Sequence, residues 1–197
     1  AAFSFISLLL TYSRGSFLSF AVGVLTLLLL SGQKKVATLM VLLFILGIFL
    51  LPKELGGEGV RLLRTASIGA RLASSQEALT IFQANPLFGV GFNAYRYARQ
   101  QSGRETVNDF GDIHSSSGTD NSFLFVLATT GIIGFSAYLF LWFAIIKNAA
   151  ENYVLIASLV AIFVHALFVN SLFYPHIMEW LWILIGITGS SKVGRSR

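Results

Sequence analysis

The sequence has no cysteine, only three prolines and few charged residues. The absence of cysteine excludes disulfides, thiolate metal sites and cysteine nucleophiles from these 197 residues. Asp, Glu, Lys and Arg make up 12% of the chain, whereas hydrophobic residues make up 55% and the mean hydropathy is +0.73. This composition indicates a membrane protein rather than a soluble domain. The basic residues are scattered, so the net charge of +5 does not indicate a nucleic acid partner.

Long apolar runs recur along the chain and determine the predicted fold. A hydrocarbon core of roughly 30 Å needs about 20 apolar residues in a helix. The candidate spans are residues 1–12, 16–30, 36–51, 122–146, 153–172 and 177–189. We therefore predict an all-α fold, a polytopic transmembrane helix bundle of about six spans with a partly helical extracytoplasmic loop. Residue 1 already lies inside an apolar run, so we expect the chain to continue a longer protein with further N-terminal helices.

The predicted organisation has four parts. Residues 1–51 are transmembrane helices, the first of them truncated, and residues 52–120 form one large loop. Residues 121–189 are three more transmembrane helices, and residues 190–197 are a basic tail. The cations of the short connections all fall on one side, which the positive-inside rule assigns to the cytoplasm. They are Lys34, Lys35, Lys147, Lys192, Arg195 and Arg197. The large loop then lies on the opposite, extracytoplasmic side.

The large loop is expected to contain a helix from Ser67, a candidate N-cap, to Ala84, where Asn85-Pro86 ends it. The apolar residues of this helix recur at helical spacing. They are Ile68, Leu72, Leu79 and Phe82. An aromatic turn follows the helix, and tyrosines and arginines come next, a mixture typical of a segment at the bilayer interface. These residues are Tyr95, Arg96, Tyr97 and Arg99.

A carboxylate stands where a polar run passes into the long apolar segment at residue 122. Thr119, Asp120 and Asn121 all suit a helix N-cap, so Asp120 is either such a cap or a catalytic group. Arg14, between two apolar runs, either snorkels to the interface or contacts a ligand. Arg71 is either an exposed helical cation or a second ligand contact. All three charged residues are expected on the extracytoplasmic side of the membrane.

Histidines are few in this sequence and do not form a metal-binding pattern. His114 is the only histidine of the large loop, where it is either a solvated side chain or a second candidate catalytic group. His176 and Glu179 stand three residues apart at a helix start, where they can pair. Because the histidines and carboxylates are scattered, we predict no metal site.

Three groups of residues, taken in chain order, resemble the superfamily of O-antigen ligases and O-antigen polymerases. The first is Tyr12-Ser13-Arg14-Gly15 before a span. The second is Arg71, followed by Glu77-Ala78-Leu79 and by Asn85-Pro86-Leu87-Phe88-Gly89-Val90-Gly91-Phe92. The third is Asp120-Asn121 with Gly131 and Gly134 behind it. Ligases of this superfamily have a histidine where this chain has Asp120, and many polymerase-like members are similar to the Asp-Asn form.

The resemblance implies a multi-pass glycosyltransferase of the bacterial inner membrane whose active face is periplasmic. Such enzymes move an oligosaccharide linked to undecaprenyl diphosphate to a hydroxyl of an acceptor glycan or of lipid A core. They do so with inversion and without a metal or other cofactor. By this analogy Arg14 and Arg71 bind the diphosphate, which suits the guanidinium group. Asp120 is then the general base, His114 is a second candidate base, and Asn121 orients the acceptor or caps the helix.

Two other classes of membrane protein stay open at this point. A polysaccharide transporter or flippase would place polar residues or broken helices at mid-membrane depth. A non-catalytic assembly protein would contact membrane lipids and partners, and it would tolerate the combined loss of Arg14, Arg71 and Asp120. The predicted spans are nearly free of charge in their interiors, and this favours chemistry at the membrane surface on a lipid-linked substrate.

Overall fold

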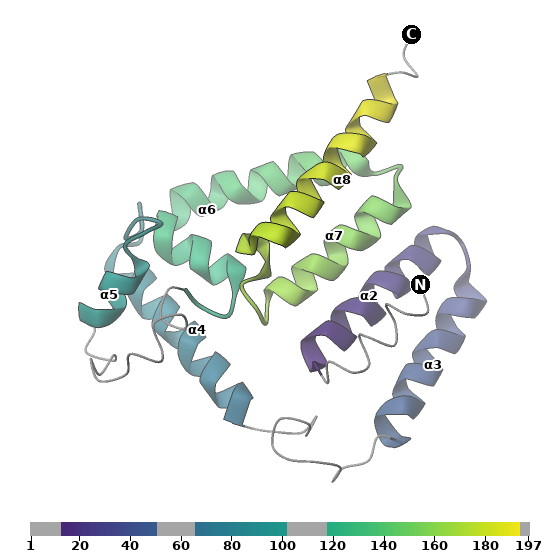
Figure 1. Ribbon diagram of the computed structural model, residues 1–197, viewed down its shortest axis with the longest axis horizontal. Coiled ribbons are helices and arrows are strands. Elements are labelled where there is room, and N and C mark those ends of the chain that lie inside the picture. The colour runs from purple at the N-terminus through teal and green to yellow at the C-terminus, as the bar shows by residue number, and fades with distance from the viewer. Residues whose placement is uncertain (1–12, 51–65, 102–117, 194–197) are drawn as a thin grey trace. The chain divides into compact units, whose positions relative to one another are not determined.

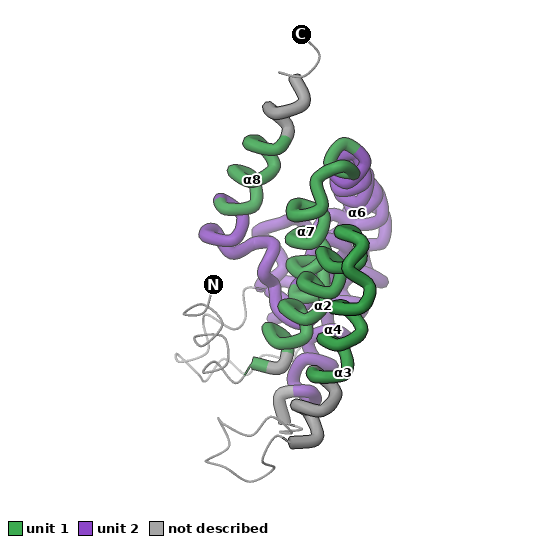
Figure 2. The backbone as a smooth tube through the Cα atoms, turned by 90° about the vertical axis from the view of Figure 1, so that its right-hand side faces the viewer, with its two compact units in different colours: residues 1–66, 148–165, 180–197 green, residues 67–147, 166–179 purple. Residues whose placement is uncertain are grey.

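The computed structural model describes residues 13–50, 66–101 and 118–193. Within these ranges it contains seven α-helices and one short 3-10 helix (Figure 1), so the all-α prediction is confirmed for the part of the chain described. The chain forms two compact units, coloured separately in Figure 2. Unit 1 comprises residues 1–66, 148–165 and 180–197, and unit 2 comprises residues 67–147 and 166–179.

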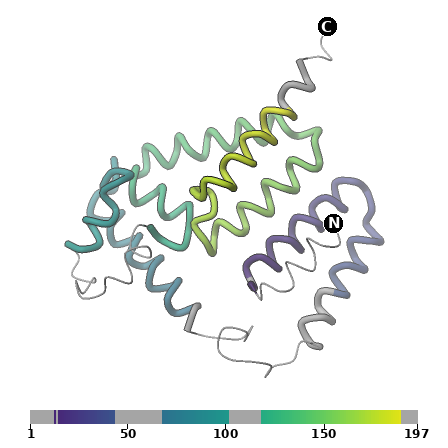
Figure 3. The backbone as a smooth tube through the Cα atoms, viewed as in Figure 1, coloured from purple at the N-terminus to yellow at the C-terminus, as the bar shows by residue number. Residues whose placement is uncertain are grey.

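Unit 1 contains a helical hairpin of α2 (Arg14–Leu30) and α3 (Lys34–Leu50), which lie side by side (Figure 3). Ser13 is the N-cap of α2, because its hydroxyl accepts a hydrogen bond from the backbone N–H of Ser16. Helix α7 (Tyr153–Ala166) packs closely on α2. A Cβ added to Gly23 of α2 would lie 2.8 Å from the methyl carbon of Ala161. Small residues therefore allow the close helix contact that is common in membrane bundles.

One helix among the described residues, α6 (Ser122–Ala149), is long and apolar enough to cross a membrane. Two shorter apolar helices cover Gly15–Leu30 and Tyr153–Ala166. The membrane prediction is therefore supported in its coarse form, and the number of six spans stays a prediction. The span predicted over residues 153–172 is too long, because α7 ends at Ala166 and a turn with the 3-10 helix η1 (Ser171–Phe173) follows. Helix α8 (Pro175–Val193) begins with proline at its first position, where no backbone N–H is needed.

The loop helix α4 (Ala66–Ala84) agrees with the predicted range to within one residue at its start. Of the four apolar residues at helical spacing, Ile68, Leu72 and Leu79 are exposed, whereas Phe82 packs against the buried residues of unit 2. The face that packs inward carries Ala78 and Ile81 instead, together with the carboxylate of Glu77. Small side chains on this face allow α4 to pack tightly against the rest of unit 2, a preference that hydrophobic spacing does not reveal.

The core of unit 2 is aromatic. The buried residues that form it are Ala78, Ile81, Tyr95, Phe125 and Ala128. The ring of Phe125 contacts the rings of Phe92, Tyr95 and Phe173, with centroids 5.2 to 5.5 Å apart and edge-on packing. Tyr95, at the start of the short helix α5 (Tyr95–Gln101), was expected at the bilayer interface but is only 1% exposed. Tyr97, two residues further on, is exposed as predicted.

Helix α6 is broken at Gly131, which has φ 64° and ψ −170°. The expectation of one unbroken apolar helix is therefore wrong, and Figure 1 shows the sharp change of direction within α6. The break separates a short half-helix of residues 122–130 from a longer apolar one of residues 132–149. A side chain at Gly131 would collide with the carbonyl group of Leu87, so the backbone of the Pro86–Gly91 turn lies directly against the break.

The turn of residues 86–91 forms hydrogen bonds with the groups that the break leaves free. Two of its N–H groups donate to carbonyls of the first half-helix, and two N–H groups of the second half-helix donate to its carbonyls. From the N–H donor to the carbonyl acceptor, the pairs are Val90 to Ala128 at 3.1 Å, Gly91 to Thr129 at 2.8 Å, Ile132 to Pro86 at 2.9 Å and Ile133 to Leu87 at 3.4 Å. Gly89, with φ 66°, allows this approach, because a Cβ there would strike the backbone of residues 129–131.

Candidate functional site

The start of α6 is capped by Asn121 and not by Asp120. The side-chain oxygen of Asn121 accepts hydrogen bonds from the N–H groups of Phe123 at 2.9 Å and Leu124 at 3.0 Å. This is the geometry of an N-cap, so the capping role suggested for Asn121 is confirmed. The N-cap reading of Asp120 is wrong. Its carboxylate is exposed, and the helix end does not need it.

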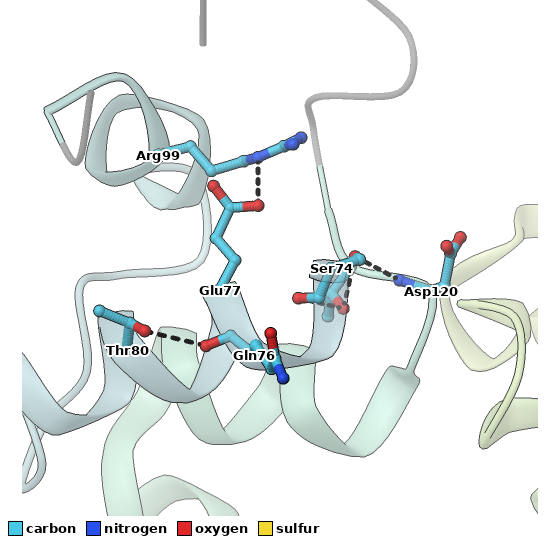
Figure 4. Close-up of polar contacts among 7 residues, drawn as sticks. Ser74, Gln76, Glu77, Thr80, Arg99 and Asp120 are labelled. Carbon is cyan, nitrogen blue, oxygen red and sulfur yellow. Dashed lines mark hydrogen bonds and ion pairs between the residues drawn. The ribbon is translucent and has the colours of Figure 1, made fainter. Parts of the chain in front are cut away.

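Asp120 is held in place through its backbone by α4. Its N–H donates to the hydroxyl of Ser74 at 3.3 Å, and the Ser74 hydroxyl donates to that of Thr119 at 3.0 Å. The Thr119 hydroxyl in turn donates to the carbonyl oxygen of Ser74 at 3.3 Å. Figure 4 shows the Asp120 carboxylate pointing away from this contact. The polar network thus fixes the main chain and leaves the carboxylate free for other interactions.

The turn between α7 and α8 supports the same helix start from another side. The side-chain amide of Asn121 donates to the carbonyl of Leu167 at 3.3 Å. The hydroxyl of Ser122, which is fully buried, donates to the carbonyl of Val169 at 3.4 Å and accepts from the N–H of Leu172 at 3.2 Å. Segments from three regions of the sequence therefore meet at residues 119–122, and they hold the exposed carboxylate on a firm backbone.

A buried ion pair lies beside this contact. The Nε of Arg99 on α5 donates to Oε2 of Glu77 on α4 at 2.8 Å. The Glu77 side chain is 7% exposed and that of Arg99 is 21% exposed. The second carboxylate oxygen of Glu77 is buried and has no hydrogen-bond partner among the described residues. Ser74 and Glu77 are three residues apart on α4, so the ion pair and the Asp120 contact occupy adjacent helical turns (Figure 4).

Tyr95 lies among these polar groups with its hydroxyl buried. The pKa of the Tyr95 phenol is raised from 10.0 to about 12, chiefly by burial and then by the negative charge of Glu77, with a smaller contribution from Asp120, whereas Arg99 and Thr119 act to lower it. The hydroxyl forms no hydrogen bond of normal geometry with the described residues. The phenol therefore stays protonated at physiological pH and cannot act as a base there.

The two predicted diphosphate-binding residues lie in different units, Arg71 in unit 2 with Asp120 and Arg14 in unit 1. Arg71 is half-buried on α4, three residues before Ser74, whose hydroxyl accepts the hydrogen bond from the N–H of Asp120. Neighbours at this spacing have Cβ atoms about 5–6 Å apart. Arg14 is the first residue of α2 in unit 1, and its side chain lies outside the described residues. His114 also lies outside the described residues.

The side chains that hold the site were only partly foreseen from the sequence. Ser74 was not singled out, Thr119 was considered only as a helix cap, and Glu77 was noted only within a motif. The spacing along α4 could have indicated the role of Glu77. One side of the helix carries Ser74, Glu77, Ala78 and Ile81, so the carboxylate shares a side with small and apolar residues. A carboxylate on the inward side of a helix requires a partner, and Arg99 supplies it. No cluster of three metal-ligating side chains occurs among the described residues.

The comparison with protein families decides what kind of protein this is. The family model described as O-antigen ligase matches residues 1–139. The chain belongs to the O-antigen ligase family. The matched region runs from α2 through the break in α6 and includes Arg14, Arg71 and Asp120. No curated protein and no solved structure matches the chain.

Membership of the O-antigen ligase family confirms the resemblance seen in the sequence. It implies a function of the O-antigen ligase or polymerase type at a membrane, and hence substrates that are lipid-linked glycans. The candidate membrane helix α6 agrees with this assignment.

Proposed function

We propose that the protein is a membrane glycosyltransferase. It moves an oligosaccharide from undecaprenyl diphosphate to a sugar hydroxyl, as an O-antigen or exopolysaccharide polymerase or as an O-antigen ligase acting on lipid A core. The observation that carries the proposal is the family match over residues 1–139. The exposed carboxylate of Asp120 inside the matched region supplies the chemical group that such a transfer needs.

Asp120 is the proposed general base. A sugar hydroxyl is a weak nucleophile until a base accepts its proton. In this scheme the Asp120 carboxylate takes that proton while the acceptor oxygen bonds to the anomeric carbon. The bond from that carbon to the diphosphate breaks, and the attack from the opposite face inverts the configuration. The firm backbone of residues 119–122 supports this role, because a base must be held at a defined distance from its substrate.

Arginines are the proposed binding groups for the leaving diphosphate. The N-terminus of a helix often binds phosphate through its free N–H groups. At the start of α6, however, Asn121 already occupies the N–H groups of Phe123 and Leu124. The charge that develops on the diphosphate must then be met by side chains, and Arg71 beside Asp120 suits this task. We assign the same role to Arg14, and we assign His114 as a second candidate base.

The proposal includes the membrane arrangement. Residues 1–51 and 121–189 are assigned to the membrane in about six spans, residues 52–120 to a periplasmic loop and residues 190–197 to a cytoplasmic tail of an inner-membrane protein. The charge distribution of the short connections supports this orientation.

The transporter alternative gains one observation, because broken helices are common in transporters and α6 is broken. The break differs from a transporter site in two respects. Its free backbone groups pair with the Pro86–Gly91 turn, and no charged residue lies between Ser122 and Ile146. A substrate or ion site at this break would lack ligands, so we favour the transferase.

Glycan analysis of a strain that lacks the full-length gene tests the proposal. The pools linked to undecaprenyl diphosphate and to the final acceptor are measured separately. Single repeat units on the acceptor, with long chains lost, identify a polymerase. Long chains that remain on undecaprenyl diphosphate, with a bare acceptor, identify a ligase. Unchanged pools would falsify the transferase proposal and favour the assembly-protein alternative, whereas accumulation on the cytoplasmic side would favour a flippase.

Variants of the full-length protein test the assigned roles in the same strain. Asp120→Asn removes the base without changing shape, and we expect product formation to fall at least 100-fold. Glu179→Gln, an exposed carboxylate of α8 in the same unit, is the matched control. Arg71→Lys keeps the charge but loses bidentate binding, so it should lower activity more than Arg96→Lys on α5. Normal activity of Asp120→Asn at normal expression would exclude Asp120 as the base.

A further inference from the structure

The turn that fills the break in α6 carries large apolar side chains on its outer surface. Leu87 is 58% exposed and Phe88 is 74% exposed, and no charged residue lies in the turn of residues 86–91. On the helix that pairs with this turn, Ile132 and Ile133 are also about half exposed. We call these four residues the wedge patch. Apolar side chains grouped in this way mark a surface that contacts an apolar partner.

Two hydrogen bonds set the position of the patch along α6. The N–H of Ile132 donates to the carbonyl of Pro86 at 2.9 Å, and the N–H of Ile133 donates to that of Leu87 at 3.4 Å. The tip of the turn therefore lies level with the first turn of the second half-helix. A shift of the tip away from this level would break both bonds and would leave the N–H groups without partners.

The second half-helix has the length of a membrane span. Residues 132–149 are helical, and they are apolar up to Lys147 and Asn148 near the end; at about 1.5 Å per residue they extend about 27 Å. This is close to the roughly 30 Å of a hydrocarbon core. If this half-helix crosses the membrane, Ile132 and Ile133 lie where it enters the acyl chains. Leu87 and Phe88 must lie at the same depth, because their backbone is bonded there.

Much of the backbone of the turn is paired, as burial in lipid requires. An irregular segment is tolerated at that depth only when its N–H and C=O groups have partners. The four hydrogen bonds between the turn and the two halves of α6 supply such partners at the break, and the N–H of Gly89 donates to the carbonyl of Asn85 at 2.9 Å. Gly89 and Gly131 allow the close approach on which these bonds depend. These bonds lower the cost of placing the turn among acyl chains.

We propose that Leu87 and Phe88 insert into the acyl chains of the leaflet that α6 enters. The Pro86–Gly91 turn is then a lipid anchor that fastens the α4–α5 part of unit 2 to the bilayer surface. Its partner is the hydrocarbon of membrane lipids and not a protein or a glycan. The proposal depends on α6 as a membrane span and not on the transferase activity. Loss of glycan product would therefore say nothing about it.

Spin labels in proteoliposomes of the full-length protein test the insertion. The 197 residues contain no cysteine, so Phe88→Cys gives a single labelling site in this region. Phe140→Cys, on the exposed apolar surface of the second half-helix, is the lipid reference, and Gln83→Cys on α4 is the water reference. We expect the Phe88 label to collide with oxygen several-fold more often than with a water-soluble nickel complex, as the Phe140 label should.

Two results would overturn the proposal. Collision of the Phe88 label mainly with the nickel complex, as at Gln83, would place the turn in water. Low collision with both reagents would mean that protein covers the turn. Phe88→Trp keeps an aromatic side chain and gives an independent measurement if the cysteine variant folds poorly. Lipids brominated near the carboxyl end of their acyl chains should quench its added fluorescence, and the absence of that quenching would also reject the insertion.

Discussion

Arg99 reaches Glu77 across the contact between α5 and α4, and its Nε lies 2.8 Å from Oε2. This pair is mostly hidden from water and lies one helical turn from the contact that holds Asp120. A buried carboxylate that loses its cation keeps the cost of desolvation without compensation. The packing of unit 2 at this contact therefore depends on the charge of Arg99.

Arg99→Ala should destabilise the protein by about 3 kcal/mol, because it leaves Glu77 buried and unpaired. Glu77→Gln should destabilise the protein less than Arg99→Ala, since burying a neutral amide costs less free energy than burying an unpaired carboxylate. Arg96→Ala, which removes an exposed arginine from the same helix, is the control and should change stability by less than about 0.5 kcal/mol. Thermal unfolding of the purified protein in detergent measures all three. Equal effects of Arg96→Ala and Arg99→Ala would contradict the structural role of the pair.

Gly131→Ala should abolish the folded state or lower its thermal stability sharply. The new methyl group would strike the Leu87 carbonyl, and the left-handed backbone at φ 64° adds roughly 1 kcal/mol of strain. Gly69→Ala is the matched control, because a Cβ there meets no atom within 4 Å. The control should be stabilising by roughly 0.5–1 kcal/mol within a helix. The yield of monodisperse protein and its unfolding temperature distinguish the two variants.

Asn121→Ala should cost about 1 kcal/mol, because the start of α6 loses its N-cap. Asp120→Ala should leave stability almost unchanged, since only the backbone of Asp120 is bonded. Asn121→Asp retains the capping oxygen and loses the bond to the Leu167 carbonyl, so its effect should be intermediate. Unfolding temperatures provide the comparison. If Asp120→Ala lowered the unfolding temperature more than Asn121→Ala, Asp120 and not Asn121 would be the N-cap.

Tyr95 should make the protein sensitive to alkali. Its pKa is raised from 10.0 to about 12, so the folded protein keeps the phenol proton at pH values where the unfolded chain loses it. This contribution is constant below pH 10, and it is lost as pH rises from 10 towards 12, by about 1.4 kcal/mol per pH unit. Tyr95→Phe should remove this part of the alkaline loss, whereas Tyr97→Phe, at an exposed position, should not. Unfolding temperatures between pH 9 and 12 test the difference.

Local signals in the sequence predicted much of the fold. The loop helix α4 was placed to within one residue, because Asn85-Pro86 stops a helix by local sterics. The start of α6 at Ser122 follows from the same kind of signal, since several residues before it suit a cap. The sequence did not show that Asn121, rather than Asp120, caps α6. Both side chains can cap, and the bond from Asn121 to Leu167, 46 residues away, favours one of them.

Features that depend on distant partners could not be predicted. The glycines of α6 suggested close packing, but a break at Gly131 requires a turn that fills it, and residues 86–91 lie about 40 positions earlier. The spacing of Ile68, Leu72 and Leu79 indicated a helix but not its inward side, since these residues are exposed while Glu77 is buried. Hydrophobic spacing shows which side of a helix is apolar, and in a membrane protein that side can face lipid instead of the core.

The break in α6 has a mechanical consequence for the carboxylate of Asp120. The half-helix of residues 122–130 acts as a spacer of about 14 Å between the break and the proposed base. Because the Pro86–Gly91 turn is hydrogen-bonded to both halves at the break, the angle between the two halves is held, and a tilt of the second half-helix in a thicker or thinner bilayer moves the first half-helix with it. Asp120 keeps its contact with Ser74, because α4 leads directly into the same turn. The distance of the proposed base from the lipid surface is thus set by a short, braced piece of helix.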